Sequence, residues 1–600
     1  MDTITLTINN RKVVAKPGMT VLEAAQQAGI YIPTLCYHKD LFPEGHCRVC
    51  LVDIKGQRSL QPACMFPVAD GMEVDTHSHA VRDSRRLVVE LLLSNHPNEC
   101  LTCVRSRNCE LQALAKEMGI RETRFEGERT VDPVDDSSFI IRDNEKCVLC
   151  RRCVRVCQGV QSVGALSAGE RGWQTVIGPA FGRDMSEVVC VNCGQCVSYC
   201  PTGALRERDS TQGVWAALRD PDAFVVVQTA PATRVALGEE MGMPHGSLVT
   251  GKMVAGLREM GFDRVFDTDF TADLTIIEEG NELIKRVNEG GELPLITSCC
   301  PGWIKFAEHL YPDLLDNLST CKSPQQMFGA VAKTYYAEKA GVDPAKMVVV
   351  SIMPCTAKKF ECERPEMNSS GYKDVDLVLT TRELGQMLRE AGIDLTQLPE
   401  EEYDDPLGAS TGAAVIFGAT GGVMEAALRT AYEVITGEIL DNLDFESVRG
   451  LAGVKEATIP VGELQVKVAV AHGLSNARKL LDMIRRGEGN YHFIEVMACP
   501  GGCLAGGGQP IPVSDEIRTK RMGAIYRADR ELPIRKSHEN PMITVIYEEF
   551  LKEPLGHKSH ELLHTHYTPR PANGMQRAQE PQGNETIPAE ATAVKAAGGQ

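Results

Sequence analysis

Two copies of one cysteine motif constrain this chain more than any other feature of its sequence. The motif C-x2-C-x2-C-x3-C ends once at residue 157 and again at residue 200, where Pro201 follows it. Such spacing binds a pair of [4Fe–4S] clusters, and the fourth cysteine of each copy ligates the other cluster. One cluster is then expected on Cys147, Cys150, Cys153 and Cys200. The other is expected on Cys190, Cys193, Cys196 and Cys157.

Metal ligation also explains the overall use of cysteine better than disulfides do. Of the 22 cysteines, fifteen precede residue 201. A disulfide-rich secreted protein needs an export signal, and the N-terminal MDTITLTINN has no charged segment followed by an apolar one. No run of 18 or more apolar residues predicts a membrane helix. We therefore expect a cytoplasmic protein without membrane contact, and the net charge of -18 disfavours nucleic acid as a partner.

Residues 1–78 are predicted to form a small β-rich [2Fe–2S] domain. Apolar residues alternate over Ile4–Ile8 as in a half-buried strand, Arg11–Ala15 is its expected hairpin partner, and a capping box at Thr20–Glu23 opens a short helix. Four cysteines offer the ligands of a two-iron cluster, namely Cys36, Cys47, Cys50 and Cys64. A structural zinc site is the alternative, although zinc usually takes two short cysteine pairs.

Residues 79–120 have helical character and carry a second ligand set, namely His96, Cys100, Cys103 and Cys109. The spacing alone fits zinc as well as a [4Fe–4S] cluster, because three thiolates and one imidazole also make a tetrahedral zinc site. The position between two redox motifs favours a cluster, since a zinc ion would interrupt an electron path. An imidazole ligand would also remove negative charge and raise the reduction potential. With this set, every cysteine before residue 201 belongs to a complete ligand set.

The character of the chain changes after the ferredoxin-like unit, which we place at residues 139–210. Apolar runs such as 224–227 and 347–350 are typical of strands buried on both faces, and they alternate with helical segments. An α/β domain with a mainly parallel sheet is therefore expected over residues 211–557. Residues 558–600 are assigned to a C-terminal tail. Because the chain after Pro569 contains almost no large apolar residues, this tail is expected to be largely disordered.

Several of the remaining cysteines come directly after apolar runs of this domain. Cys299–Cys300, Cys355 and Cys499 each follow a predicted strand. Because ligands of open α/β sheets bind outside the carboxyl ends of the strands, these cysteines should meet at one site. Cys503 lies four residues past Cys499 and should reach the same site. The sequence therefore predicts one more [4Fe–4S] cluster in this domain.

Three motifs in this domain resemble those of iron-only ([FeFe]) hydrogenases. They are TSCCPGW at 297–303, MPCTAKK at 353–359 and MACPGGC at 497–503. The order of the upstream cysteine sets is also similar to that of the large bacterial enzymes of this family. The resemblance covers nearly the whole chain, and it implies reversible oxidation of molecular hydrogen to protons and electrons.

The resemblance implies a catalytic assembly called the H-cluster. In the family, a four-iron cubane is held by the residues that match Cys300, Cys355, Cys499 and Cys503. The last of these bridges to a two-iron unit that carries carbonyl, cyanide and an azadithiolate. Lys358 matches the residue that pairs with a cyanide ligand. The residues that match the lining of the pocket are Ala230, Pro231, Ser323, Gln325, Met353, Phe417 and Met497.

The resemblance also implies a proton route. The matching residues are, from the inside outward, Cys299, Glu279, Ser319, Glu282 and Arg286. A thiol and partly buried carboxylates suit proton transfer through an apolar shell. Each assignment has an ordinary alternative: the two glutamates could form a solvated helix face, Lys358 could be a surface charge, and Cys299 a small buried apolar residue.

The expected fold is multidomain, α+β and α/β. It consists of an N-terminal [2Fe–2S] ferredoxin-like β-grasp, a small helical domain whose cluster has one histidine and three cysteine ligands, a two-[4Fe–4S] ferredoxin-like domain and a C-terminal α/β hydrogenase domain. The expected cofactors are one [2Fe–2S] cluster, three accessory [4Fe–4S] clusters and the H-cluster.

Electrons are expected to pass to ferredoxin, or to NAD(P) through flavin-binding partner subunits with further iron–sulfur clusters. No G-x-G-x-x-G opens a helix after a strand, so this chain is not predicted to bind a nicotinamide by that route. Two other classes of function compete with this interpretation. A cluster-bearing relay or scaffold without the two-iron unit is disfavoured by the three intact motifs. A complex I-like electron-transfer subunit is disfavoured by the four cysteines of the C-terminal site.

Overall fold

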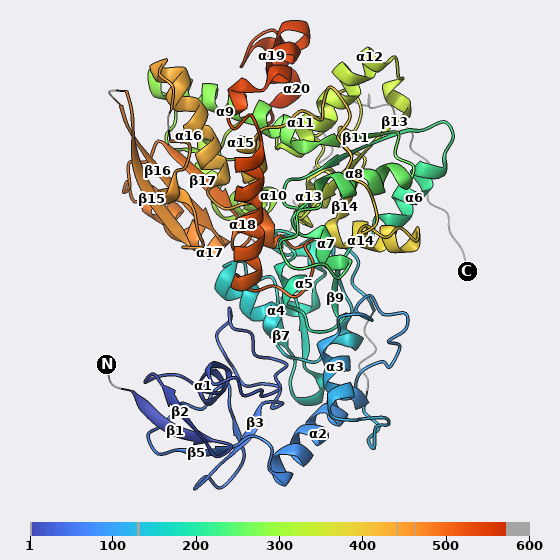
Figure 1. Cartoon of the computed structure of the whole chain (residues 1–600), viewed down its shortest axis with the longest axis vertical. Helices are drawn as coiled ribbons and strands as arrows, with labels where there is room; N and C mark the ends of the chain where they lie inside the picture. The colour runs from blue at the N-terminus through green and yellow to red at the C-terminus, as the bar shows by residue number, and fades with distance from the viewer. Residues whose placement is uncertain (1–2, 129–132, 441, 463, 572–600) are drawn as a thin grey trace, which may run out of the picture.

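The computed structural model of the chain describes residues 3–128, 133–440, 442–462 and 464–571. Figure 1 shows an elongated molecule in which the N-terminal units lie at one end and a large α/β domain lies at the other. Two short cysteine-bearing helices, α4 (Arg152–Arg155) and α5 (Gln195–Tyr199), lie between them. The order of the units along the chain is therefore also their order in space.

The N-terminal unit is a β-grasp built on a five-stranded sheet with the order β2-β1-β5-β3-β4. The expected hairpin, capping box and short helix are confirmed, because β1 pairs with β2 and the Thr20 side chain caps α1 through the Glu23 backbone. Leu6 and Ile8 point into the core, as the alternation predicted. The elements are β1 (Ile4–Ile8), β2 (Arg11–Ala15), α1 (Val21–Gln27), β3 (Leu51–Ile54), β4 (Gln61–Pro62) and β5 (Glu73–Asp75).

Two small cysteine-bearing units follow the β-grasp. The first consists of α2 (His79–Ser94) and α3 (Glu110–Glu117), with a cysteine-rich loop between them. In the second, the two motif copies run into α4 and α5, and strand β6 (Ile140–Arg142) pairs with β9 (Leu205–Glu207). A small hairpin of β7 (Ser167–Gly169) and β8 (Val176–Gly178) lies on this unit. The repeated motif thus forms one pseudo-symmetric ferredoxin-like unit.

The α/β domain contains two four-stranded sheets, which corrects the expectation of one mainly parallel sheet. The first has the order β11-β10-β13-β14 and is parallel throughout. The second has the order β12-β17-β16-β15 and is parallel except for the hairpin of β15 and β16. Their strands are β10 (Phe224–Thr229), β11 (Arg264–Asp267), β12 (Leu295–Ile296), β13 (Met347–Met353), β14 (Leu377–Thr380), β15 (Val454–Val461), β16 (Leu464–His472) and β17 (Phe493–Met497).

Helices cover both sheets, and several of them begin beside the strand ends that matter for function. Helix α10 follows β12 with Cys300 at its N-cap and Pro301 as its first residue, a position that proline tolerates well. The long helix α9 carries buried glutamates along its second half. The main helices are α6 (Thr211–Arg219), α8 (Thr250–Glu259), α9 (Thr268–Glu289), α10 (Pro301–Leu310), α11 (Pro324–Val331), α13 (Ala357–Glu361), α14 (Thr381–Glu390), α16 (Gly422–Thr436) and α17 (Leu474–Arg485).

The C-terminal segment packs back onto this domain. Helix α18 (Asp515–Glu531) runs along the middle of the domain between the two sheets, and α19 (Pro541–Ile546) and α20 (His557–Leu563) lie beside α9 and α11 (Figure 1). Residues 558–571, expected as the start of a tail, instead form α20 and a strand-like bridge between Cys321 and His564. The rest of the expected tail, residues 572–600, lies outside the described residues.

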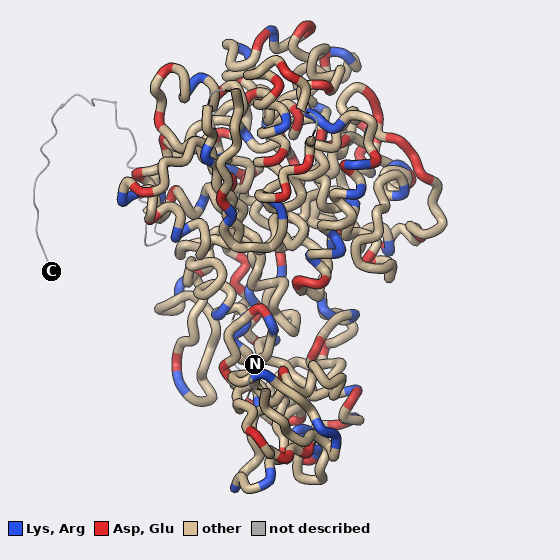
Figure 2. Tube along the Cα trace, turned by 60° about the vertical axis from the view of Figure 1, so that its left-hand side comes forward, with Lys and Arg blue, Asp and Glu red and all other residues tan. Residues whose placement is uncertain are grey.

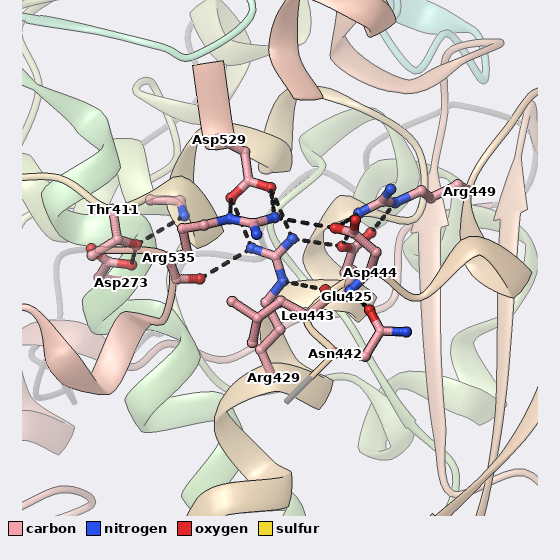
Figure 3. Close-up of polar contacts among 11 residues, drawn as sticks. Asp273, Thr411, Glu425, Arg429, Asn442, Leu443, Asp444, Arg449, Asp529 and Arg535 are labelled. Carbon is pink, nitrogen blue, oxygen red and sulfur yellow. Dashed lines mark hydrogen bonds and ion pairs between the residues drawn. The ribbon is translucent and has the colours of Figure 1, made fainter. Parts of the chain in front are cut away.

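A buried ion network holds α18 against α16. Arg429 donates to Asp529 on α18 over 2.9 Å and to Glu425 on its own helix over 2.6 Å. Arg535 also donates to Asp529, and Arg449 also donates to Glu425, as Figure 3 shows. Because a buried charge is costly unless it is paired, this network specifies how the two helices dock.

Charge is otherwise spread over the molecule, since Figure 2 shows acidic and basic residues interspersed in every part. Within the described residues, no helix combines the length and the apolar character required to cross a bilayer.

Candidate iron–sulfur centres and active site

The four cysteines of the β-grasp lie together at one sulfur-rich site. The Cys36 side chain hydrogen-bonds those of Cys47 and Cys64, and Cys64 also hydrogen-bonds Cys50. The Cys36 amide donates to the Cys47 sulfur over 3.4 Å. The structure therefore brings together the whole set that the spacing predicted for a two-iron cluster.

Three further ligand sets each line a hollow of their own. His96, Cys100, Cys103 and Cys109 line the first. The second is lined by Cys147, Cys150, Cys153 and Cys200, and the third by Cys157, Cys190, Cys193 and Cys196. The fourth cysteine of each motif copy thus lies with the first three of the other copy, as the ferredoxin pattern requires. At the first hollow, Nδ1 of His96 lies 2.8 Å from the Pro97 carbonyl. Such a bond orients a metal-binding imidazole by its other nitrogen.

The cysteines of the C-terminal domain converge from both sheets. Cys300 follows β12, Cys499 and Cys503 follow β17, and Cys355 follows β13 of the other sheet. The Ala498 amide donates to the Cys300 sulfur over 3.4 Å, which ties the first and third motifs together. Burial raises the pKa of all four thiols, that of Cys355 to about 12.

These donor sets fit iron–sulfur clusters. Every one of the 22 cysteines lies in the described part of the chain, and none forms a disulfide there. Several buried thiolates side by side would repel one another, and burial disfavours each of them further. A bound iron cluster supplies the positive charge that offsets both costs. Sets of four soft donors in closed hollows are the ligands that such clusters use.

Hydrogen bonds link the outer candidate proton carriers, Glu279, Ser319, Glu282 and Arg286, to one another. Ser319 donates to Glu282 over 2.9 Å, and Arg286 pairs with the other Glu282 oxygen at 2.6 Å. Glu279 also hydrogen-bonds Ser319. Burial, and then the Glu282 charge, raises the pKa of Glu279 to about 8. Burial also raises the pKa of Cys299 well above its usual range, with Glu279 as the next cause.

Lys358 is buried beside the inner cysteines rather than exposed on the surface. Its Nζ donates to the Cys299 carbonyl over 3.1 Å and to Glu361 over 2.9 Å. Burial alone would lower the pKa of Lys358, but the Glu361 carboxylate outweighs it and raises the pKa. Glu361 also accepts from Ser323 over 2.8 Å and from Gln325 over 3.1 Å.

Glu361 was missed by sequence reasoning, although it orients three of the candidate site residues. It lies only three residues after Lys358, on α13, and an i,i+3 pair on a helix is the one signal that could have found it. The other candidate lining residues are buried in two groups. Phe417 and Met497 pack together with Cys299, and Ala230 and Met353 share a core cluster in which β10 meets β13. Pro231 is buried next to Ala230.

Residues of neighbouring cluster sites contact one another along the length of the molecule. At Gly507, beside the inner site, an added Cβ would lie 2.3 Å from the Cys193 carbonyl, so only glycine permits this approach. At the other end, Arg155 donates to the carbonyls of both Cys36 and Cys150. The Arg105 side chain donates to the Cys200 carbonyl over 3.0 Å. Both N-terminal sites therefore border the same site, the one with Cys150 and Cys200.

The fold and these sites define an iron–sulfur oxidoreductase in which a string of cluster sites leads to one buried site. Profile comparisons agree with this class. The description "Iron only hydrogenase large subunit, C-terminal domain" matches residues 223–507, and "Iron hydrogenase small subunit" matches residues 515–570. A 2Fe-2S cluster binding domain matches residues 1–79, an iron-sulfur binding region of NADH-ubiquinone oxidoreductase-G matches 85–124, and a 4Fe-4S dicluster domain matches 146–204.

Whole-chain relatives lead to the same family. The chain is 53% identical to "NADP-reducing hydrogenase subunit HndD" of Solidesulfovibrio fructosivorans, over 95% of this chain and 100% of the relative. It is 40% identical to "Iron hydrogenase 1" of Clostridium pasteurianum, over 94% and 99% of the two chains. A solved structure of a variant of [FeFe]-hydrogenase HydA1 from Chlamydomonas reinhardtii matches with 46% identity and a TM-score of 0.55, over 60% of this chain and 99% of that chain.

The chain belongs to the iron-only ([FeFe]) hydrogenases. It is an enzyme that acts on molecular hydrogen, and it carries iron–sulfur clusters together with the H-cluster of that family. The expected multidomain fold class is confirmed. Residues 515–570, which include α18, α19 and α20, are similar to the small-subunit profile and are called the small-subunit segment below. Sequence reasoning did not separate this segment from the catalytic domain.

Proposed function

We propose that this chain oxidises hydrogen reversibly at a buried H-cluster and passes the electrons through four accessory clusters to partner proteins. The single observation that carries the proposal is the convergence of four cysteines from two sheets beside a buried lysine and a buried thiol. An isolated relay would need the four cysteines, but it would not need Lys358 or Cys299 next to them.

Cys300, Cys355, Cys499 and Cys503 would hold the cubane of the H-cluster, with Cys503 shared with the two-iron unit. When bound, this cofactor supplies the redox chemistry that splits and forms molecular hydrogen. Lys358, held by Glu361, would donate to an anionic ligand of the cofactor. The lining residues would exclude water from it, namely Ala230, Pro231, Ser323, Gln325, Met353, Phe417 and Met497. The accessory sites would hold one [2Fe–2S] and three [4Fe–4S] clusters on the sets described above.

The proton would leave the site through Cys299, Glu279, Ser319 and Glu282. The Cys299 thiol, next to Cys300 in the chain, would give and accept a proton beside the bound cofactor. The raised pKa of Glu279 keeps this side chain protonated near neutral pH. Its carboxyl group can therefore pass one proton on and be reprotonated. Ser319 bridges the two glutamates, and Arg286 pairs with Glu282 at the outer end.

The electrons would leave at the opposite end of the molecule. The sites of Cys193 and Cys150 form the central path, and the [2Fe–2S] site and the site of His96 are two candidate exits. We infer a flavin- and NAD(P)-binding partner assembly with further iron–sulfur clusters, because the relative HndD is named as a subunit of an NADP-reducing hydrogenase. Ferredoxin is the alternative acceptor. The cytoplasmic location stays a prediction.

Hydrogen oxidation by the isolated, matured chain under strict anaerobiosis tests the acceptor. Viologen dye, ferredoxin and NAD(P) are offered separately. We expect activity with dye and none with NAD(P) alone, because a nicotinamide would need a partner subunit. Rapid turnover with ferredoxin would favour ferredoxin as the direct acceptor. No activity with any acceptor, in protein whose two-iron unit is confirmed by infrared bands, would reject the proposed reaction in favour of an electron relay.

The Cys299→Ala variant tests the inner end of the proton route. We expect it to lose turnover while it keeps the infrared bands of the H-cluster. Cys362→Ala is the matched control, since Cys362 is a buried thiol that donates only to the Lys359 carbonyl. Loss of the bands in Cys299→Ala would instead indicate that Cys299 is needed to assemble the site.

A further inference from the structure

The small-subunit segment places two histidines against the buried glutamates of α9. His564 is buried, with Nδ1 at 2.8 Å from the Thr320 hydroxyl and Nε2 at 3.2 Å from a Glu278 oxygen. One turn earlier on α20, His560 is exposed, and its ring centroid lies 4.3 Å from that of His564. Two adjacent imidazoles, tilted with respect to each other, thus lead from the interior to the surface.

We propose that His564 and His560 form a second exit of the proton route, which branches from Glu282 and reaches solvent along α20. The inference rests on the proposed route through Glu279, Ser319 and Glu282. It adds carriers from the small-subunit segment, which the three hydrogenase motifs do not include.

The junction with the main route is a compact group of three ionisable side chains. Glu282, Cys321 and His564 are all buried, and one oxygen, sulfur or nitrogen of each lies within 4.8 Å of the others. A gap of this size is bridged by one water or by small side-chain movement. The Thr320 amide donates to Glu282 over 3.1 Å, and its hydroxyl contacts His564, so one residue spans the junction.

A fixed carboxylate lies against the His564 ring. Burial alone would raise the pKa of Glu278, but hydrogen bonds from His564 and Tyr547 outweigh it and lower the pKa. The Leu555 amide donates to the same carboxylate over 2.9 Å. The Glu278 carboxylate is therefore held in place as a charged acceptor beside the His564 ring.

The step balances as a simple proton transfer. The Glu282 O–H bond breaks, an N–H bond forms on His564, and that proton passes to His560 and then to water. Burial, and then His564, lowers the pKa of His560, so His560 readily releases its proton to solvent. The other charged groups around His560 are Glu278, Lys285 and Glu282.

The same three atoms could be considered as a cation site, but the hydrogen bonds favour a proton relay. Both Glu282 oxygens already accept from Ser319 and Arg286. Both His564 nitrogens are engaged by Thr320 and Glu278. A cation would have to break these bonds, whereas Thr320 already links the two side chains, through its amide to Glu282 and through its hydroxyl to His564.

The test uses the matured full chain with three variants. His564→Gln keeps a donor for Glu278 but cannot carry a proton, and His560→Ala removes the exposed ring without disturbing the core. His557→Ala is the matched control, because His557 is an exposed histidine on the same helix. Hydrogen production is measured against pH in water and in heavy water, and infrared bands confirm that the H-cluster is intact.

We expect His564→Gln and His560→Ala to lower turnover about threefold, less than the ~10²-fold or greater loss of an obligatory carrier. Both should change the shape of the pH profile and increase the solvent isotope effect, and millimolar imidazole should restore His560→Ala. His557→Ala should match the unmodified chain in every measurement.

Unchanged rates, pH profiles and isotope effects in both His564→Gln and His560→Ala would overturn the branch. Rejection of the proposed main route would give a different result, because Glu279→Gln and Glu282→Gln would then retain turnover. An effect of imidazole on His557→Ala equal to that on His560→Ala would also overturn the proposal, since rescue would not depend on the relay.

Discussion

Glu361 matters at the scale of single residues because it holds three site residues with one carboxylate. Glu361→Gln removes the charge that pairs with Lys358, while Ser323 and Gln325 keep an acceptor. Loss of such a supporting contact typically reduces metal-site activity by about 10–100-fold. We expect a loss in this range, with a shift of the cyanide infrared bands that reports a displaced lysine.

The control for this variant is Glu363→Gln, because Glu363 is an exposed carboxylate two residues away that pairs with Lys373. It should leave both activity and bands unchanged. If Glu361→Gln had the same activity and infrared bands as Glu363→Gln, the contact between Glu361 and Lys358 would not be needed for activity.

Glu279 gives the route a pH dependence of defined sign. Its pKa of about 8 lies above that of an unfolded glutamate, about 4.3. The carboxyl is therefore a proton donor below pH 8 and an acceptor above it. We expect hydrogen production to fall and hydrogen oxidation to rise as the pH passes through about 8.

Measured pH profiles of both directions check this prediction. Glu279→Gln should lose turnover in both directions, whereas Glu289→Gln, at the exposed end of the same helix, should keep the profile of the unmodified chain. The raised pKa of Glu279 also makes the free energy of unfolding depend on pH. Because folding favours the protonated carboxyl, the contribution of Glu279 to stability is intact below about pH 4.3 and declines as the pH rises to about 8.

The sequence carries a clear signal for the cysteine sets that the structure brings together and little signal for the residues that support them, for a physical reason. Four thiolates on one cluster require short, repeated spacings, and Cys147 to Cys157 display such a spacing openly. Glu361 and His564 carry no comparable pattern. Their importance comes from contacts with residues 38 and 286 positions away, which only the folded chain creates.

At the scale of elements, strand positions were predictable but their grouping into sheets was not. The apolar runs before Cys300, Cys355 and Cys499 are strands, as expected. An apolar run in the sequence does not show which strands will pair with it, however. In the structure, β13 belongs to a different sheet from β12 and β17. The cysteines still converge, because the carboxyl ends of both sheets face the same interior site. Helix α20, which lies in the expected tail, was missed because it is short and only tertiary packing buries its apolar residues.

The docking of α18 onto α16 depends on the ion network of Figure 3. Arg429→Leu would leave the buried carboxylates of Glu425 and Asp529 without their shared partner. Breaking a buried pair in this way typically costs about 3–5 kcal/mol. We expect a clearly lower unfolding temperature of the full chain by calorimetry. Arg486→Leu is the control, since Arg486 pairs with Glu488 on the surface and should leave the unfolding temperature unchanged. Equal unfolding temperatures for the two variants would contradict the role of the network.

At the scale of the whole molecule, the contacts between units support the proposal of a branched electron path. Clusters can exchange electrons only when they lie close together, and the contacts of Arg155 and Arg105 place two N-terminal sites against one central site. Two exits from one central site would let the chain serve two acceptors, or one acceptor and one electron store.

Arg155 is the residue through which this arrangement can be tested. It is buried between the units, where it donates to the carbonyls of Cys36 and Cys150 and pairs with Glu44. Arg155→Leu removes these contacts and leaves both ligand sets in place. Under hydrogen, we expect the electron paramagnetic resonance signal of the reduced [2Fe–2S] cluster to appear more slowly, while the signals of the ferredoxin-like pair appear at the usual rate.

The control variant is Arg58→Leu, an exposed arginine of the same β-grasp. It should reduce its [2Fe–2S] cluster as fast as the unmodified chain does. Equal rates in Arg155→Leu and Arg58→Leu would mean that electrons reach the N-terminal cluster by another path. A slowed signal in Arg155→Leu alone would instead assign the β-grasp as one of the two exits, because the interface of Arg155 is then the link through which its electrons pass.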